Sequence, residues 1–485
     1  MIKLNNNYSK SIPRVTLISL LAMFSGSSHL FAGHPSVFTA AGNPPVKASQ
    51  FDLKANKDHL GRKIHHVSQL IVSFKNTVTK ASGQQITAQY AAGTKRSFGK
   101  NGKFKLVNLK AGQTLAQAMA TFKSDSNIAS VEYNYYVYPQ KTPDDPSYSS
   151  LWGLNNTGQT FNRIVGVAGS DIKAETAWDS ITSCTTSRVA VLDTAIYTNH
   201  IDLTNNIRFA SMADFIDNDD NPSPTVGTGI DPNGVSANNE VHGSHVTGTI
   251  AALGNNSLGV TGVCWNASII PIRVLSATGG TTVELVSGID FAIDNGAKVI
   301  NMSLSTAGSN TAFKEAMDRA LAADIVVVAA AGNDGVDVDS GSNPTFPCSF
   351  THANILCVAA LDHQFKLASF NATQGSNFGR TSVDVGAPGK FILSTTFSAT
   401  SAANISPTYS SFQGTSMAAP HVSGVVALVR SWNPGYTAVQ TVKAIKNSGV
   451  NVADLNNVTT TGKAVNAFSA LHYIETPRSV GATVN

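Results

Sequence analysis

Between residues 188 and 332, short apolar runs alternate with longer segments that have the periodicity of helices. The apolar runs are RVAVLD (188–193), SIIPIRVL (268–275), AKVINMSL (297–304) and IVVVAAAG (325–332). The helix-like segments are HVTGTIAAL (245–253), ELVSGIDFAIDNG (284–296) and TAFKEAMDRALAAD (311–324). Such alternation predicts an α/β fold, a doubly wound parallel sheet with helices on both faces. Ligands of these sheets bind at the carboxyl ends of the strands.

A smaller α+β unit is predicted ahead of this sheet, at residues 67–140. The runs QLIVSF (69–74) and VEYNYYVYPQ (131–140) alternate like strands. Between them, TLAQAMATFK (114–123) places four apolar residues on one helical face: Leu115, Ala118, Met119 and Phe122. Polar residues 34–66 form a leader linker, and the Pro-rich KTPDDP (141–146) opens the larger domain, residues 141–485.

The first residues have the layout of a secretory signal peptide. Lys3, Lys10 and Arg14 precede the apolar run VTLISLLAMF (15–24), which small residues follow. This run is too short to span a bilayer, and no later stretch reaches about 18 apolar residues. We therefore expect a signal peptide within residues 1–33, no membrane span, and a secreted protein, either extracellular or periplasmic.

Charge is divided unevenly along the chain, whose net charge is +4. Residues 1–140 contain 17 Lys+Arg and 4 Asp+Glu, whereas the remainder contains 17 and 26. A basic front segment is compatible with nucleic-acid binding, and equally with docking on the chain's own acidic body.

Four cysteines in an exported chain predict disulfides, for which three pairings exist. Cys348 and Cys357 flank the turn-like SFTHAN and favour one bridge, which leaves Cys184 with Cys264. The latter two each precede an apolar run, so parallel neighbouring strands would bring them to one edge of the sheet. Four buried free thiols are the alternative.

The stretch GTSMAAPH (414–421) places Ser416 among small residues, immediately before the buried-helix pattern VSGVVALV (422–429). At a helix start, a serine is either a cap or a nucleophile whose oxyanion meets the free N–H groups. A nucleophile needs a base, a carboxylate that orients the base, and an oxyanion donor. His242, Asp193 and Asn333 supply these at the ends of predicted strands or the start of a helix.

Each of these residues also has a structural interpretation. Asp193 is compatible with a strand-end turn, His242 with a capped or core histidine, and Asn333 with a tight turn. His242 and His245 have metal-pair spacing, but a third ligand is missing. The four residues together, at the expected edge of the sheet, favour catalysis.

Five blocks of the sequence resemble the subtilisin-like serine proteases over roughly residues 142–472. They are VAVLDTAI, HGSHVTGTIAAL, INMSLS, VVVAAAGNDG and GTSMAAPHVSGVVALV, in the subtilisin order Asp, His, Ser. The pattern is most similar to the thermitase and subtilisin branch. The resemblance implies Asp193 as the orienting carboxylate, His242 as the general base, Ser416 as the nucleophile and Asn333 as an oxyanion donor.

The same resemblance implies a substrate-binding strand and a pocket. The implied residues are Ser303, Leu304, Ser305, Ala330 and Gly332. Ala195, Val241 and Ser305 stand where the family has glycine or a small residue, and the added side chains are expected to narrow the cleft. They bear on specificity more than on activity. Asp334 at the pocket rim weakly favours basic substrate residues.

The front unit resembles the ferredoxin-like inhibitory propeptide of these proteases. Its last strand, VEYNYYVYPQ, is expected to lie in the cleft like a cleaved product, with self-cleavage between Tyr138 and Lys141. The opposite charges of the two parts are consistent with docking, so nucleic acid is not expected as a partner.

Calcium is the expected cofactor, because carboxylate and carbonyl oxygens select it. The loop GNNSLGV (254–260) resembles the stronger family site. The implied ligands are the side chains of Asp145, Asp202 and Asn256 and the carbonyls of Leu253, Leu258 and Val260. The loop DFIDNDDNPS resembles a thermitase calcium loop, with Asp214, Asp217, Asp219, Asn221 and Ser223; a solvated acidic turn is the alternative.

These observations predict a secreted serine endopeptidase made as a self-processing zymogen, with protein or peptide substrates and a monomeric state. The alternative is a catalytically silent relative that binds peptides or a partner, and the three departures near the triad motivate it.

Overall fold

The computed structural model describes residues 51–52, 57–58, 65–136, 141–208, 211–224, 240–401 and 404–474. The predicted signal peptide, most of the leader and the predicted cleavage residues 138–140 lie outside these ranges. Within the leader, β1 (Phe51–Asp52) and β2 (Lys57–Asp58) form a short antiparallel pair.

The small domain is a four-stranded antiparallel sheet with two helices, in the strand order β4-β5-β3-β6. Its elements are β3 (His65–Phe74), α1 (Lys80–Tyr90), β4 (Gly93–Phe98), β5 (Phe104–Asn108), α2 (Leu115–Ser124) and β6 (Ile128–Tyr135). Thr114 and Gln117 form a capping box at the start of α2. Ala118 and Phe122 of α2 pack against Leu70, Val72 and Val107, as the helical spacing predicts.

The larger domain is built on a nine-stranded sheet in the order β10-β11-β9-β12-β13-β14-β15-β19-β18. All neighbours pair in parallel except β18 and β19. The strands are β9 (Val189–Asp193), β10 (Ala213–Asp214), β11 (Ile269–Arg273), β12 (Val299–Met302), β13 (Val326–Ala330), β14 (Ile355–Leu361), β15 (Val385–Pro388), β18 (Val450–Asn451) and β19 (Lys463–Ala464).

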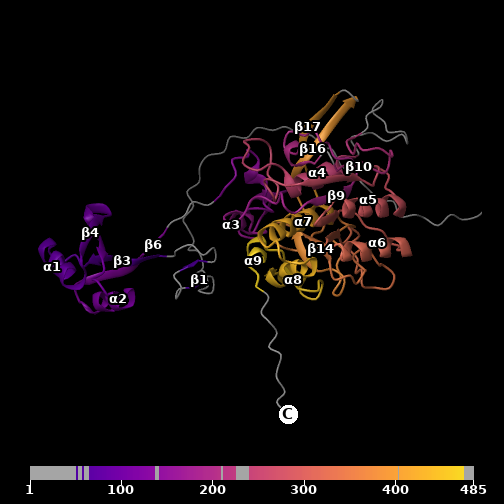
Figure 1. The fold of residues 1–485 in the computed structure, drawn as a ribbon. Helices are drawn as coiled ribbons and strands as arrows, with labels where there is room; N and C mark the ends of the chain where they lie inside the picture. The colour runs from indigo at the N-terminus through magenta and orange to yellow at the C-terminus, as the bar shows by residue number, and fades with distance from the viewer. Residues whose placement is uncertain are drawn as a thin grey trace, which may run out of the picture. The chain divides into compact units, whose positions relative to one another are not determined.

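Helices cover both faces of this sheet, as predicted (Figure 1). Along β9, Val189 and Val191 face one hydrophobic core, whereas Ala190 and Leu192 face the other. The first core includes residues of α4 and α7, and the second includes residues of α5 and α6. The helices are α3 (Ala174–Trp178), α4 (His242–Ala251), α5 (Thr282–Asp294), α6 (Thr311–Ala322), α7 (Thr415–Trp432), α8 (Ala438–Ser448) and α9 (Ala467–Leu471).

A long antiparallel hairpin of β16 (Ile392–Ser401) and β17 (Asn404–Phe412) was not predicted from the sequence. It lies along α4, where the Ser394 and Thr395 hydroxyls donate to the carbonyls of His245 and Ser244 at 2.8 and 2.7 Å. Its far end extends beyond the body of the domain (Figure 1). A second, short hairpin pairs β7 (Thr160–Phe161) with β8 (Ile164–Val165).

Both predicted disulfides are confirmed. Cys184 pairs with Cys264, and Cys348 pairs with Cys357, with Cα–Cα distances of 6.0 and 5.2 Å. The strands that follow Cys184 and Cys264, β9 and β11, are parallel neighbours, which is the arrangement that the pairing required.

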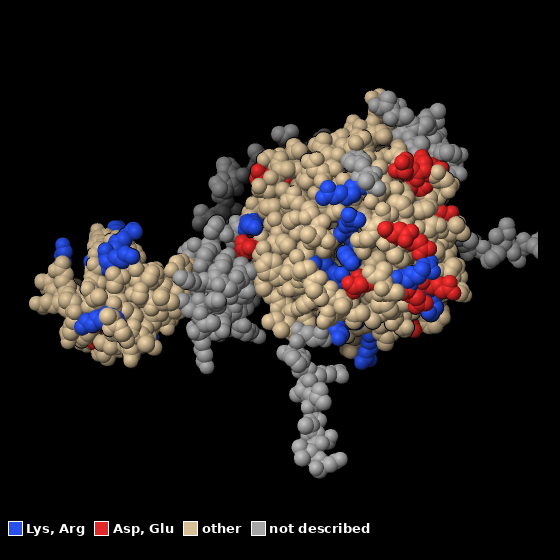
Figure 2. Space-filling model, viewed as in Figure 1, with Lys and Arg blue, Asp and Glu red and all other residues tan. Residues whose placement is uncertain are grey.

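The surface charges follow the division seen in the sequence. In Figure 2, the charged side chains visible on the small domain are mostly Lys and Arg, whereas the larger domain shows groups of Asp and Glu beside groups of Lys and Arg. Residues 65–136 contain nine Lys and Arg but only two acidic residues. No helix within the described ranges is long and apolar enough to cross a membrane.

Candidate active site

Asp193 and His242 form a close pair at the carboxyl edge of the sheet. Asp193 is the last residue of β9, and His242 is the first residue of α4. The distance from His242 Nδ1 to Asp193 Oδ1 is 2.7 Å. The Asp193 side chain is fully buried, whereas that of His242 is 14% exposed, so one edge of the imidazole can meet a ligand.

Thr194 ties these two residues together. Its backbone N–H donates to Asp193 Oδ1 at 2.7 Å, and its hydroxyl accepts from the N–H of Gly243 at 2.9 Å. The same hydroxyl donates to the carbonyl of Glu240 at 2.9 Å. Thr194 therefore fixes the end of β9 relative to the start of α4.

Two opposing effects determine the pKa of His242. Burial alone would lower it, but the charge of Asp193 and the hydrogen bond to its carboxylate together raise the pKa above the ordinary value. Because Asp193 accepts at Nδ1, the proton of the neutral ring lies on Nδ1, and Nε2 is left as the basic nitrogen.

Ser416 lies in the first turn of α7, behind a glycine with a left-handed backbone. Gly414 has φ of 148°, which favours glycine, and its N–H donates to the carbonyl of Gly389 at 2.8 Å. The Ser416 hydroxyl donates to the carbonyl of Ser303 at 3.0 Å, and the Ser303 hydroxyl donates to the carbonyl of Ser416 at 2.8 Å. Among the described residues, no hydrogen bond joins Ser416 to His242.

Asn333 lies beside the start of α7, three residues after β13. Its Oδ1 accepts from the backbone N–H and the hydroxyl of Thr415, at 2.8 and 3.0 Å. Since the N–H can only donate, this bond fixes which end of the amide is oxygen. The Nδ2 of Asn333 is thereby turned away from Thr415 and kept as a donor.

The residues implied in substrate binding also lie at this edge. Ser303 follows β12 and contacts Ser416, and Leu304 and Ser305 continue from it, partly buried. Ala330 ends β13, and Gly332 follows with φ of 104°, its N–H donating to the Thr415 hydroxyl at 3.1 Å.

The three residues that depart from the family pattern, Ala195, Val241 and Ser305, have different surroundings. Ala195 is fully buried, so its methyl group does not face the cleft, contrary to the expectation from the sequence. Val241 packs in a small apolar cluster with the hairpin residues Phe397, Ala399 and Ile405. The side chain of Val241, which is larger than the family's usual residue before the histidine, therefore packs against the long hairpin. Ser305 is partly buried, and Asp334 is exposed.

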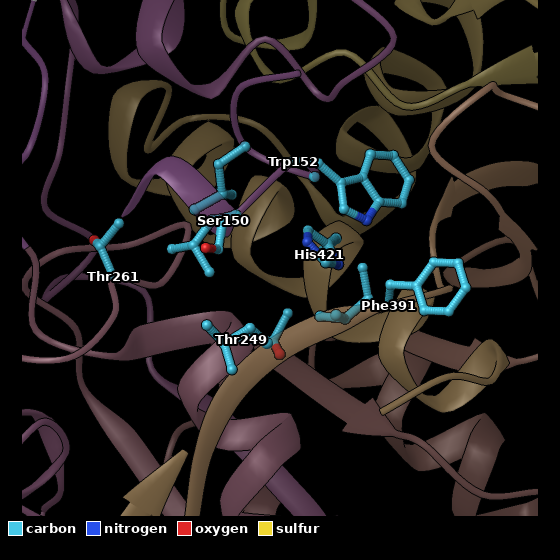
Figure 3. Close-up of a pocket in the computed structure, with 11 residues that line it drawn as sticks. Ser150, Trp152, Thr249, Thr261, Phe391 and His421 are labelled. Carbon is cyan, nitrogen blue, oxygen red and sulfur yellow. The ribbon is translucent and has the colours of Figure 1, made fainter. Parts of the chain in front are cut away.

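The remaining histidines near these elements do not contact Ser416. His421 of α7 bonds through Nδ1 to the carbonyl of Met417 at 2.8 Å, and burial lowers its pKa to about 4. It lines a separate small pocket with residues that include Trp152, Thr249 and Phe391 (Figure 3). His245 bonds to the carbonyls of Ile392 and Ser410, and burial lowers its pKa to about 3. His245 thus anchors the hairpin, and a metal pair with His242 is not supported.

The loop predicted as the stronger calcium site collects two buried carboxylates. Asp145 Oδ2 accepts from the N–H of Asn255 at 2.7 Å, and Asp202 accepts from Asn256 Nδ2 at 2.8 Å and from the N–H of Val260 at 3.1 Å. Burial, opposed by backbone hydrogen bonds and reinforced by the charge of Asp202, raises the pKa of Asp145. Carboxylates so placed fit a cation. Calcium would need the Asn256 amide to turn, because its oxygen now accepts from the N–H of Leu258 at 2.9 Å.

The second predicted calcium loop is organised around an arginine. Asp214 Oδ2 and Asp217 Oδ2 both bond to Nη1 of Arg273 at 2.7 Å. Farther along the loop, Asp219 Oδ1 accepts from the N–H of Asn221 at 2.8 Å, and the Ser223 hydroxyl pairs with that of Thr198 at 2.7 Å. The Arg273 guanidinium thus occupies the place of a cation beside Asp214 and Asp217, which are two of the five predicted ligands. This set therefore does not fit calcium. Arg273 gave little signal in the sequence because it is a single charge inside an apolar strand.

Comparisons with known proteins agree with this fold. Residues 185–467 match the Subtilase family, and residues 62–134 match the fervidolysin N-terminal prodomain. The chain is 35% identical to thermitase of Thermoactinomyces vulgaris, over 68% of this chain and 100% of thermitase. It is 34% identical to subtilisin E of Bacillus subtilis, over 76% and 87%.

Two further proteins resemble the chain. It is 38% identical to an extracellular protease of Xanthomonas campestris pv. campestris, over 66% of this chain but only 54% of that protein. A solved structure of a protease from Pseudoalteromonas arctica has a TM-score of 0.55 and 31% identity, and covers 68% of this chain and 99% of that one.

The fold and these relatives define a serine endopeptidase preceded by a prodomain. The chain belongs to the subtilase family.

Proposed function

We propose that this subtilase cleaves peptide bonds through an acyl-enzyme, with Ser416 as nucleophile, His242 as general base and Asp193 as the carboxylate that orients it. The observation that carries the proposal is the 2.7 Å contact between His242 Nδ1 and a fully buried carboxylate. A buried carboxylate holds the tautomer that leaves Nε2 basic, and it stabilises the imidazolium formed during the reaction.

In the first step, the Ser416 hydroxyl leaves the carbonyl of Ser303 and turns to Nε2 of His242. The Oγ atom forms a bond to the scissile carbonyl carbon as the hydroxyl proton passes to Nε2. The C–N bond then breaks, and the same proton is delivered to the leaving amine. A water molecule then attacks the acyl-enzyme in the same way, with His242 taking its proton and returning it to Ser416 Oγ. The carboxylic acid product is released, and Ser416 is regenerated.

The tetrahedral oxyanion would be met by Asn333 Nδ2 and by the N–H of Ser416. The first of these donors is oriented by the bonds from Thr415 to Asn333 Oδ1. The second is one of the free N–H groups at a helix start. Ser303, Leu304 and Ser305 would pair with the substrate backbone, with Ala330 and Gly332 on the opposite wall of the pocket.

The proposal includes maturation and export. Residues 1–33 would direct secretion, and residues 67–140 would act as an intramolecular inhibitor that the enzyme removes by cleavage between Tyr138 and Lys141. The excess of Lys and Arg in the small domain and the excess of Asp and Glu in residues 141–485 support such inhibition.

Calcium is proposed at the loop of Asp145, Asp202 and Asn256, with the carbonyls of Leu253, Leu258 and Val260. The two carboxylates are buried, and the ion would supply charge neutralisation and hold residues 141–146 to the domain. No step of the reaction involves it.

A serine-reactive fluorophosphonate tests the site directly. After purified protein is labelled, peptide mass spectrometry should place the adduct on Ser416 in the wild type. The variants Ser416→Ala and His242→Ala should lose the label there. Labelling of another residue, or none in a wild type freed of its prodomain, would refute the assignment.

A further inference from the structure

A buried arginine holds the segment that leads into α4. Arg273 ends β11 and is 1% exposed. Besides its bonds to Asp214 and Asp217, its Nη2 donates to Glu240 Oε1 at 3.0 Å. Glu240 is itself 3% exposed and lies two residues before His242.

Glu240 is fixed through both its side chain and its backbone. Oε1 also accepts from the N–H of Ala277 at 3.2 Å, and the carbonyl accepts from the Thr194 hydroxyl at 2.9 Å. α4 starts with no side-chain cap at Val241, so these contacts help to define how the chain enters the helix.

The contacts continue from Glu240 to the Asp193–His242 pair. Thr194 bonds to Glu240, to the N–H of Gly243 and to Asp193 Oδ1. Arg273 is also directly opposite Asp193 in the parallel pairing of β11 with β9. Residues in register on parallel strands project from the same face, so Arg273 and Asp193 share the face that α4 covers.

We propose that the Glu240–Arg273 ion pair is a positioning device for the reaction. It fixes the start of α4 so that the His242 ring stays within hydrogen-bonding distance of Asp193 and at the correct angle to Ser416. The inference rests on the proposed role of His242. A buried ion pair contributes little net stability but can select one geometry, and small displacements of a catalytic group are costly in rate.

The surroundings of His242 make its titration a sensitive measure of this geometry. Asp193 faces it from β9, His245 lies on its own helix, and His421 lies on α7; burial keeps the last two neutral. Among the described residues, the ion-paired groups Arg273, Glu240, Asp214 and Asp217 lie at the segment that leads into α4. A looser contact with Asp193 lowers the pKa of His242, since that carboxylate is what raises it.

The test compares Glu240→Gln with a matched control, Asp324→Asn. Asp324 likewise accepts one bond from a buried arginine, Arg430, and one from a backbone N–H, that of Ala438, but its side chain is 42% exposed and it lies beyond α6. Both variants remove one carboxylate from one guanidinium. Two readouts are measured: kcat and KM on a peptide substrate, and the titration of the His242 ring by NMR in the Ser416→Ala full chain.

We expect Glu240→Gln to lower kcat at least tenfold with KM within about twofold, and to lower the His242 titration midpoint. Asp324→Asn should leave both readouts at wild-type values. If Glu240→Gln matches Asp324→Asn in both, the pair is merely structural and the proposal is overturned.

An inactive wild type and an unfolded Glu240→Gln variant are two further outcomes of this test. An inactive wild type would refute the proposed function, while the NMR titration would still decide the positioning role. If Glu240→Gln does not fold, Glu240→Asp is measured in the same way, because it keeps the charge but shortens the reach to Arg273.

Discussion

Asn333 Oδ1 accepts from the backbone N–H of Thr415 at 2.8 Å, and this bond holds the asparagine amide with its nitrogen turned away from Thr415. The bond joins the loop after β13 to the first turn of α7. The proposed oxyanion donor is therefore fixed before any substrate arrives, which is the condition under which such a donor is most effective.

Asn333→Ala should consequently lower kcat while changing KM little. In subtilisin, loss of the oxyanion asparagine costs about 10²–10³ in kcat, and we expect a loss of that order here. Steady-state kinetics on a chromogenic peptide give the comparison. A kcat within threefold of the wild type would show that Asn333 does not stabilise the oxyanion.

On the acid side of the pH–activity profile, half-maximal activity should occur above about pH 6.5, the ordinary pKa of histidine. His242 acts as a base only when neutral, and Asp193 raises its pKa. Activity should therefore fall as pH decreases through that raised value. The profile of kcat/KM between pH 5 and 9 measures it, and Asp193→Asn should move the limb to lower pH. A wild-type limb below pH 6 would contradict the assignment.

The fold should lose stability between pH 6.5 and 5, because buried histidines resist protonation. The pKa of His421 is depressed to about 4, whereas in the unfolded chain the ring takes up a proton near pH 6.5. The unfolded state thus binds more protons in this window, and stability falls as pH falls, by up to about 1.4 kcal/mol per pH unit for one such group.

This loss is measured as the Tm of the Ser416→Ala protein, which cannot digest itself. His421→Gln in the same background should reduce the dependence of Tm on pH. An unchanged Tm from pH 7 to pH 5 would show that these rings are protonated in the folded state.

Chelation should destabilise the protein through the loop of Asp145 and Asp202. At a calcium concentration 100 times the Kd, binding contributes about 2.7 kcal/mol. EGTA should lower the Tm of the Ser416→Ala protein, and adding Asp202→Asn should abolish that response. Asp290→Asn, at an exposed carboxylate, should retain it. The same Tm with and without EGTA would refute calcium at this loop.

The sheet and its helices were predictable because their patterns are simple. Strands such as Val326–Ala330 are buried on both faces and read as continuous apolar runs. The long hairpin gave no such signal: β16 and β17 are rich in Ser and Thr, and their polar side chains bond to α4 and to each other.

The candidate site was predictable where a residue ends a strand or begins a helix, as Asp193 and His242 do. The supporting contacts were not. The partners of Arg273 come from residues 214, 217 and 240, which only the fold brings together. Asn333 and Thr415 are likewise far apart in the sequence. Because the sequence did not show which carboxylates Arg273 contacts, the acidic loop was predicted to bind calcium and not a guanidinium.

Self-processing tests the central claim most directly. The intact masses of the wild type and of Ser416→Ala are compared after incubation with calcium. We predict that the wild type loses the segment that ends between Tyr138 and Lys141, and that Ser416→Ala keeps it. If the wild type also remains whole, or if both proteins are cut alike, self-cleavage by Ser416 is contradicted.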